Sequence, residues 1–497
     1  MLFNSIQFLL FFPLVCLVYF VIPQKIKWIW LLLASYYFYM CWNPKYALLM
    51  FASTLITWLS GFFIDRFNRV QPPKKSQALK KLTVAVSFSA NLAILFFFKY
   101  FDFAVDNINH LLSALNIQLI NPSFDVILPV GISFYTFQAL SYTMDVYREE
   151  IPPEKNLFRY MLFVSFFPQL VAGPIERSKN LIHQLREKHS FSISNMKNGL
   201  LLMLWGYFQK LVIADRAAIA VNNVYNNYQN FGSVELILAT LLFALQIYCD
   251  FSSYTDIARG AAQVMGFKLM DNFQQPYFSR SIAEFWRKWH ISLSGWFKDY
   301  LYIPLGGNKK GKVRKYINIM IVFLTSGLWH GASWHYVIWG ALHGAYQVIG
   351  GITLPIRQKL CTVFSIDRNT HAHRFVQRII TFILVSFGWI FFRANTMSDA
   401  IGITKTIFTV QNPWVLTDGS VFAMGLDAKQ LLVIAAAAIV LFSVSSMHYL
   451  GKNMRGMILG TNIFIRWSIV FIMLFTVLIF GIYGPGYSES QFIYFQF

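Results

Sequence analysis

The sequence predicts an all-α protein that crosses a membrane many times. Of its 497 residues, 56% are hydrophobic and only 13% are charged, and a soluble protein carries about twice that share of charge. The mean hydropathy is +0.48. Apolar runs recur almost from end to end, and inside a bilayer the backbone must satisfy its own hydrogen bonds, so these runs are expected to be helices. At about 20 apolar residues per span, they predict roughly ten or more crossings.

The candidate spans are the apolar runs between polar or basic segments. They cover residues 7–22, 26–42, 46–64, 82–98, 126–147, 157–172, 196–213, 234–248, 316–329, 336–349, 379–392, 431–446 and 463–482. The first run has no basic segment before it and no cleavage site of small residues after it. We therefore expect a retained helix there rather than a signal peptide.

Several of these runs contain residues that break helices. Pro129, Pro168 and Pro174 lie within or beside them, with Gly131 and Gly173 close by. Such breaks predict half-length or re-entrant helices, which a membrane protein tolerates where protein or a water-filled cavity covers the backbone. The sequence has no repeat of 20–50 residues and no low-complexity linker, so residues 1–497 are expected to form one domain without a separate soluble part.

Basic residues are concentrated between the apolar runs. The chain has 42 Lys and Arg against 22 Asp and Glu, a formal net charge of +20. Segments 66–81, 309–315 and 357–378 are the most basic, and the positive-inside rule places them in the cytoplasm. No basic stretch forms a soluble module, so nucleic-acid binding is not expected. The four cysteines form no CxxC pair, so neither a metal site nor a disulfide framework is indicated.

Histidines are the unusual feature of the apolar sequence. Four of the ten lie in one region, namely His290, His330, His335 and His343. Residues 316–356 contain no Asp, Glu, Lys or Arg, which predicts that the last three histidines lie deep in the membrane. An ionisable side chain at that depth is costly, and by default it marks a functional site.

Histidine suits proton transfer because the unperturbed pKa of imidazole lies near neutrality. The alternative is a structural histidine that hydrogen-bonds between helices. We expect the chemical role for His330, which stands between Trp329 and Gly331 in the cluster, and the structural role for His335 and His343.

A second group of candidate residues covers positions 284–300. Its tryptophans, Trp286, Trp289 and Trp296, alternate with lysine and arginine, as in a helix that lies at the membrane interface. One interpretation is a plain membrane anchor in which His290 has no chemical role. The other places His290 at the cytoplasmic mouth of a cavity, where nearby cations meet a phosphate-rich donor.

Polar residues also interrupt the apolar sequence at positions 246–259. Asp250 and Asp256 are costly there unless they are paired. Arg259 follows Asp256 by three residues, close enough for an ion pair on a helix. We therefore expect structural pairing in this segment.

Eight segments, taken in order along the chain, resemble the membrane-bound O-acyltransferase (MBOAT) family. They are residues 2–5, 129–134, 166–175, 248–256, 285–294, 329–331, 391–394 and 492–497. Within the family they are most similar to the bacterial branch that includes the alginate O-acetyltransferase membrane subunit and the teichoic acid D-alanyl transfer protein.

The resemblance implies an MBOAT-like helical bundle, with re-entrant and interfacial helices around a central cavity, in the inner membrane of a bacterium. It implies acyl transfer to a hydroxyl from a cytoplasmic thioester donor, with acetyl-CoA expected as the donor substrate and no bound cofactor. His330, in the Trp-His-Gly motif, is then the catalytic histidine and acts as a general base. His290, in the Trp-His-x-Ser-Leu-Ser segment, is the second functional histidine.

The resemblance also implies partners beyond the lipid bilayer. The acyl group passes through the membrane to an extracytoplasmic partner of the SGNH-hydrolase type, which acetylates a polysaccharide. Alginate, cellulose, peptidoglycan and other exopolysaccharides all stay open as the acceptor.

Two other functions stay open on the residues alone. Broken helices and buried histidines also fit a transporter or flippase for a glycan precursor or a small anion. Against this, the sequence has no internal repeat and its histidines cluster in one segment. A scaffold that recruits glycan-modifying proteins would leave the histidines dispensable.

Overall fold

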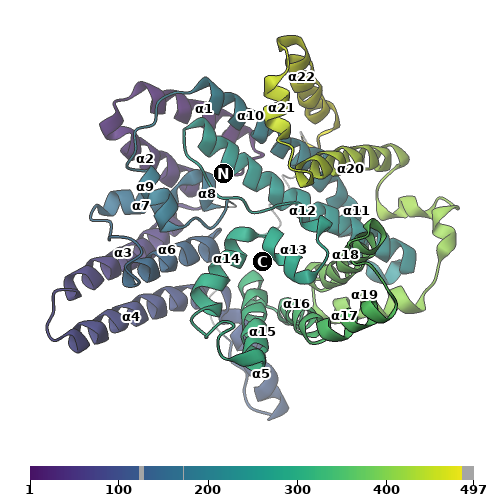
Figure 1. The fold of residues 1–497 in the computed structure, drawn as a ribbon, viewed down its shortest axis with the longest axis horizontal. Helices are drawn as coiled ribbons and strands as arrows, with labels where there is room; N and C mark the ends of the chain where they lie inside the picture. The colour runs from purple at the N-terminus through teal and green to yellow at the C-terminus, as the bar shows by residue number, and fades with distance from the viewer. Residues whose placement is uncertain (122–127, 172, 484–497) are drawn as a thin grey trace. The chain divides into compact units, whose positions relative to one another are not determined.

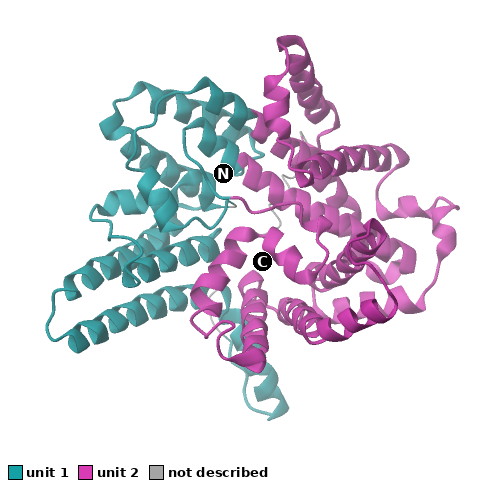
Figure 2. Cartoon of the chain, viewed as in Figure 1, with its two compact units in different colours: residues 1–200, 258–270 teal, residues 201–257, 271–497 magenta. Residues whose placement is uncertain are grey.

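The computed structural model describes residues 1–121, 128–171 and 173–483, and every regular element in these ranges is a helix (Figure 1). The motif at residues 492–497 lies outside the described residues, as does the start of the run predicted at 126–147. By its internal contacts the chain divides into two compact units, which Figure 2 shows in teal and magenta. The single-domain organisation stays a prediction.

Unit 1 comprises Met1–Leu200 and Ala258–Met270. Its helices are α1 (Ile6–Val21), α2 (Lys27–Met40), α3 (Pro44–Phe67), α4 (Pro73–Lys99), α5 (Phe101–Ala114), α6 (Ile132–Tyr147), α7 (Leu157–Ser165), α8 (Phe167–Leu170) and α9 (Ser178–Gln184), with parts of α10 (Ile193–Tyr207) and α12 (Ser233–Val264). The long helices α3, α4 and α6 pack on one another (Figure 1). Ser60 of α3 bonds to Thr143 of α6 at 2.8 Å, and Ser53 donates to Asn91 of α4 at 2.5 Å. Such hydrogen bonds hold helices together where lipid provides no hydrophobic driving force.

The predicted breaks in unit 1 are confirmed at two positions. Helix α6 begins directly after Gly131, whose φ of +75° is readily adopted only by glycine. Helices α7 and α8 are separated at Phe166, and Pro168 lies in the first turn of α8, where proline is tolerated. The described part of the run predicted at 157–172 therefore forms the short helices α7 and α8, and that of the run predicted at 126–147 contains the 16-residue α6.

Unit 2 comprises Leu201–Ile257 and Asp271–Phe497. Besides the rest of α10 and α12, it contains α11 (Asp215–Asn226), α13 (Ile282–Lys288), α14 (Ile291–Phe297), α15 (Gly311–His330), α16 (Trp334–Ile352), α17 (Leu354–Val363), α18 (His371–Arg393), α19 (Met397–Thr409), α20 (Ala428–Tyr449), α21 (Met454–Gly460), α22 (Ile463–Phe480) and the π-helices Phe208–Ala214 and Lys298–Tyr302. Short 3₁₀ helices cover Gln24–Ile26 in unit 1 and Tyr228–Asn230, Pro276–Phe278, Pro413–Leu416 and Ser420–Met424 in unit 2.

A buried ion network fixes the first π-helix to its neighbours. Lys210, 1% exposed, places Nζ 2.9 Å from Oδ1 of Asp215 and 2.6 Å from Oδ1 of Asp250 in α12. Gln209 donates a hydrogen bond to Asp256 at 3.1 Å and accepts one from Ser252. The expected pairing of Asp250 is thus confirmed, with a lysine that the sequence pattern did not single out. Removing one member of such a buried pair usually costs about 3–5 kcal/mol.

Six described helices are individually long and apolar enough to cross a membrane, namely α3, α4, α12, α18, α20 and α22. Helices α16 and α17 meet at a 48° bend and give a seventh if they form one span. Other predicted runs form shorter helices, such as α1 with 16 residues and α2 with 14. Ten or more crossings are possible only if these shorter helices also cross the membrane. The number of crossings therefore stays a prediction.

Candidate active site

Helices α15 and α16 form a tight hairpin because glycines lie where they touch. A Cβ on Gly340 would lie 2.2 Å from the backbone oxygen of Phe323. At the turn, a Cβ on Gly331 would lie 2.2 Å from the ring of Tyr336. Small residues allow helix backbones to approach closely in a membrane. The Trp-His-Gly motif therefore occupies the end of α15 and the turn into α16.

His330 is the last residue of α15 and is 2% exposed. Aromatic rings surround its imidazole in edge-to-face contact. The centroid distances are 5.0 Å to Trp329, 4.9 Å to Trp339 of α16 and 5.4 Å to Phe392 of α18. Three helices therefore position this side chain, in apolar surroundings.

His290 joins α13 to α14 and is fully buried. Its φ of 44° and ψ of 55° lie in the left-handed region, which few residues other than glycine adopt. Its ring lies 4.7 Å from Phe251 of α12 and 6.0 Å from Trp329, measured between centroids. Residues in such conformations persist only where the surroundings hold them, and they occur most often at functional sites.

Asn272 holds the turn that carries His290. The backbone N–H of Ile291 donates to the Asn272 carbonyl at 2.9 Å, and the Ser292 hydroxyl donates to Oδ1 of Asn272 at 2.6 Å. Asn272 in turn donates to the Thr255 hydroxyl of α12 at 3.2 Å. These bonds connect the left-handed turn to a long helix, which explains how its geometry is maintained.

Local sequence also fixes the start and end of α13. The Ser281 side chain accepts a hydrogen bond from the Glu284 backbone N–H at 3.2 Å, as expected of an N-cap serine. The Glu284 carboxylate pairs with Lys288 one turn later at 2.8 Å. The helix ends where Trp289 N–H bonds to the Phe285 carbonyl at 2.7 Å.

The structure brings the two predicted site histidines together. His290 and His330 are separated by 39 intervening residues in the sequence, yet their ring centroids are 6.5 Å apart. At this distance a small reacting group can contact both rings. The structure therefore places two buried imidazoles in one location.

The other two histidines of the cluster make cross-helix contacts. His335, in α16, bonds through Nδ1 to the Phe391 carbonyl of α18 at 3.0 Å. His343 is fully buried, and its Nδ1 accepts a hydrogen bond from the indole N–H of Trp286 at 3.2 Å. Both contacts are of the kind expected for structural histidines.

The single interfacial helix predicted over residues 284–300 is wrong in one respect. The segment forms two seven-residue helices, α13 and α14, followed by a π-helix. The break falls at His290, which lies buried among aromatic rings. The alternation of tryptophan and basic residues could not reveal this break, because it depends on the distant Asn272.

Sequence reasoning also missed residues that form the site. Trp339 and Phe392 contact His330, and Asn272 positions His290. Phe392 lies in the segment 391–394, which was singled out only because it resembles the MBOAT family. Trp339 lies beside Gly340, and this glycine was the one available signal of close packing at that point of α16.

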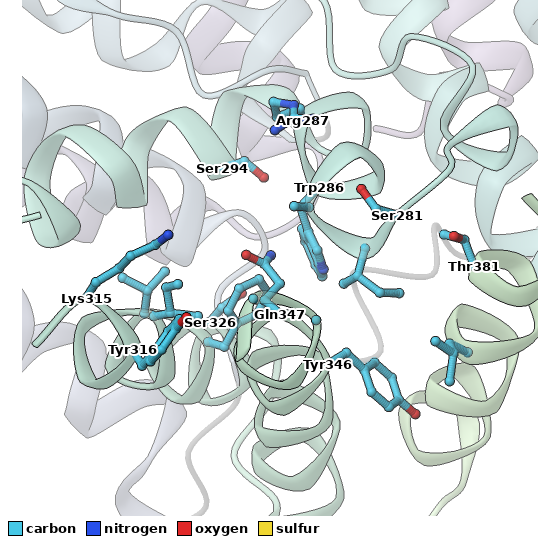
Figure 3. A pocket seen from close by; sticks show the side chains of 18 of the residues that line it. Ser281, Trp286, Arg287, Ser294, Lys315, Tyr316, Ser326, Tyr346, Gln347 and Thr381 are labelled. Atoms are coloured by element: carbon cyan, nitrogen blue, oxygen red, sulfur yellow. The ribbon is translucent and has the colours of Figure 1, made fainter. Parts of the chain in front are cut away.

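A cavity of about 740 Å³ lies in unit 2 beside this site (Figure 3). Trp286 and Phe323 line it, and their rings lie 5.2 and 6.4 Å from that of His343. In Figure 3 the ring of Trp286 extends from α13 toward Gln347. The described side chains that line the cavity include five cations and no carboxylate. The cations are Arg280, Arg287, Lys298, Lys315 and Arg357.

Comparisons with known proteins identify the family of the chain. The sequence model of the membrane-bound O-acyltransferase family matches residues 75–397. A probable alginate O-acetylase AlgI of Pseudomonas putida is 34% identical over the full length of both chains. A peptidoglycan O-acetyltransferase of Helicobacter pylori is 34% identical, over 82% of this chain and 79% of its own. A teichoic acid D-alanyltransferase of Bacillus subtilis is 28% identical, over 45% of this chain and 59% of its own.

The six described helices that are long and apolar enough to cross a membrane define an integral membrane protein. The chain belongs to the membrane-bound O-acyltransferase family. It is therefore an O-acyltransferase and a multi-pass protein of the bacterial inner membrane. This membership decides between the enzyme and the transporter that the residues alone left open.

The α15–α16 contact can be tested by a single methyl group. Gly340→Ala places a Cβ against the Phe323 backbone, so α15 and α16 must separate, and we expect a loss of about 1–3 kcal/mol in stability together with a loss of activity. The measurement is thermal unfolding in detergent, with activity measured on the same preparation.

Gly350→Ala is the matched control, because it lies in the same helix and nothing is within 4 Å of its Cβ. Alanine is the better helix former, so this variant should be as stable as the parent or slightly more so. Equal thermal stability and equal activity of Gly340→Ala and Gly350→Ala would contradict the close packing of α15 against α16.

Proposed function

We propose that this enzyme transfers an acetyl group from acetyl-CoA, or a related acyl thioester, for the O-acetylation of an extracytoplasmic polysaccharide. The observation that carries the proposal is the buried pair His290 and His330 at 6.5 Å. Relatives named as an alginate O-acetylase and a peptidoglycan O-acetyltransferase support both the acetyl group and a glycan acceptor.

His330 is the general base of the proposed reaction. Its neutral imidazole takes the proton of the accepting hydroxyl as that oxygen forms a bond to the thioester carbonyl carbon. This contribution is typically worth about 10²–10⁴-fold in rate. The carbon–sulfur bond then breaks, and the leaving thiolate takes the proton back from His330. Atoms and charge balance without a covalent enzyme intermediate.

His290 is the proposed donor to the oxyanion. During the attack, the carbonyl oxygen gains negative charge, and a fixed N–H in a water-poor site stabilises it more than bulk water does. The bonds through Asn272 hold His290 in place before the reaction begins. No reorganisation is then needed when the charge develops.

The basic cavity is the proposed donor site. Its apolar walls suit the pantetheine arm of a thioester, and its five cations suit the phosphates. Trp339 contacts both His343 and His330, at 5.2 and 4.9 Å, so the aromatic wall of the cavity adjoins the catalytic pair. Lys315 also belongs to the basic segment 309–315, which the positive-inside rule places in the cytoplasm, where acetyl-CoA is available.

The acceptor is proposed to lie on the other side of the membrane. The acetyl group would pass to an extracytoplasmic partner of the SGNH-hydrolase type, which then acetylates the polysaccharide. Helix α15 supports this direction, because it is 20 residues long, begins in the basic segment and ends at His330. At 1.5 Å per residue this is about 30 Å, the thickness of a hydrocarbon core.

The assignment of His330 predicts a selective loss of activity. His330→Ala should lower acyl transfer from labelled acetyl-CoA by about 10²–10⁴-fold in membranes with matched expression. His335→Ala is the control, since it removes a second buried histidine of the same hairpin and should keep most of the activity per folded molecule. Comparable activity in the parent and His330→Ala would remove His330 from the mechanism.

The donor site predicts a change in substrate affinity. Arg287→Gln combined with Lys315→Gln removes two cations from the cavity wall, so KM for acetyl-CoA should rise about tenfold or more, with kcat little changed. The matched control is Lys309→Gln combined with Lys312→Gln, which removes equal charge from the adjacent loop without touching the cavity lining. Equal KM values in the two double variants would show that Arg287 and Lys315 do not bind the donor. Their positive charge would then serve only to orient the protein in the membrane.

A further inference from the structure

Unit 1 contains a second basic cavity, separate in sequence from every residue assigned above. It has a volume of about 330 Å³ and lies where the turn between α1 and α2 meets α7 and the loop after α9. Its charged lining consists of Lys25, Lys27, Arg159, Arg186, Lys188 and Glu187, with His189 and Trp28 beside them. Cations therefore outnumber carboxylates by five to one in this lining.

Lys27 is the central cation of the cavity. It is only 8% exposed, and its Nζ donates a hydrogen bond to the His189 carbonyl at 2.9 Å. Its Nζ also lies 4.8 Å from the ring centroid of Tyr19 and 5.5 Å from that of Phe20. Within the described chain no carboxylate comes within 4 Å of it. A buried ammonium without a counter-charge is costly, so this position favours an anionic ligand.

The two arginines of the cavity are already paired. Glu154, 5% exposed, accepts from Arg186 at 2.6 and 3.1 Å and lies 3.8 Å from Arg159. Glu187 is likewise within 3.3 Å of His183. These pairs fix the arginines at the wall of the cavity. Excess positive charge remains on the three lysines, which are free to face a phosphate.

The surroundings of the cavity are those of a lipid surface. Leu14, Leu17 and Val21 of α1 are exposed, and so are Ile29 and Leu33 of α2. Helices α1 and α2 both extend from the turn next to Lys25 and Lys27 (Figure 1). A phosphate in the cavity would therefore have acyl chains along α1 and α2. A soluble phosphate compound would gain nothing from these faces.

The charge pattern places this turn at the cytoplasmic surface. Helices α2 and α3 contact each other and are joined by residues 41–43 alone, so the chain returns to the same side by the end of α3. The basic segment there, residues 66–81, covers the end of α3 and the first turns of α4, and the positive-inside rule assigns it to the cytoplasm. The cytoplasmic leaflet supplies anionic lipids to such sites.

We propose that this cavity binds the phosphate headgroup of an anionic glycerophospholipid, with Lys27 as the buried contact and Lys25 and Lys188 as the outer contacts. The lipid would link the α1–α2 turn to the loop after α9, which Gln24 already joins by a hydrogen bond to the Glu187 carbonyl at 3.0 Å. The proposal does not depend on the acyl-transfer mechanism.

The test is lipid retention by the full-length protein in detergent. Equimolar phosphatidylglycerol and phosphatidylcholine are added, and bound lipid is measured by native mass spectrometry. The parent should retain phosphatidylglycerol in about fivefold excess or more. Lys27→Met should abolish the excess. Lys25→Gln combined with Lys188→Gln, which changes only exposed residues, should do the same without disturbing the fold.

Lys74→Gln combined with Lys75→Gln is the matched control, because it removes two exposed charges from the start of α4 in the same unit. It should retain the lipid as the parent does. Equal retention of both lipids by the parent, or equal loss in the control and the Lys25 and Lys188 variant, would overturn the site. Displacement of the lipid by inorganic phosphate or free CoA would identify a soluble phosphate as the occupant and overturn the lipid assignment.

Discussion

The close contact between α15 and α16 is the constraint on which the candidate active site depends. Gly327 and Gly340 allow the two backbones to touch, since a Cβ on either would lie within 2.4 Å of a backbone oxygen of the other helix. This contact sets Trp339 against His330. A membrane offers little hydrophobic force between helices, so packing at this distance has to come from the residues themselves. The glycines are therefore as much a part of the site as the histidines.

A second requirement is that buried polar groups have partners. Lys210 joins Asp215 and Asp250, while Asn272 connects the His290 turn to α12. These bonds are strong where water is scarce, and they restrain the backbone around them. Asp250 is adjacent in sequence to Phe251, whose ring packs on His290. The same long helix thus carries the ion network and one wall of the candidate active site, which restrains the backbone on both sides of it.

The sequence was most informative where the membrane imposes a simple rule. Apolar runs predicted the helices, and Pro168 and Gly131 predicted their breaks, because hydrocarbon leaves few alternatives to helix. His330 stood out because a stretch without formal charge surrounds it. The left-handed turn at His290 could not be predicted, since it depends on Asn272, 18 positions earlier. The partner of Asp250 was missed for the same reason, because Lys210 is distant in sequence.

The central claim is that His290 and His330 act together in one step. It is tested most directly by kcat/KM for acyl transfer in His290→Ala, His330→Ala and the double variant. Residues that act as a unit give non-additive losses, so the account predicts that the double variant is about as impaired as His330→Ala alone. If the fold-loss of kcat/KM in the double variant equals the product of the fold-losses in the two single variants, the histidines act independently, and this result would contradict the account.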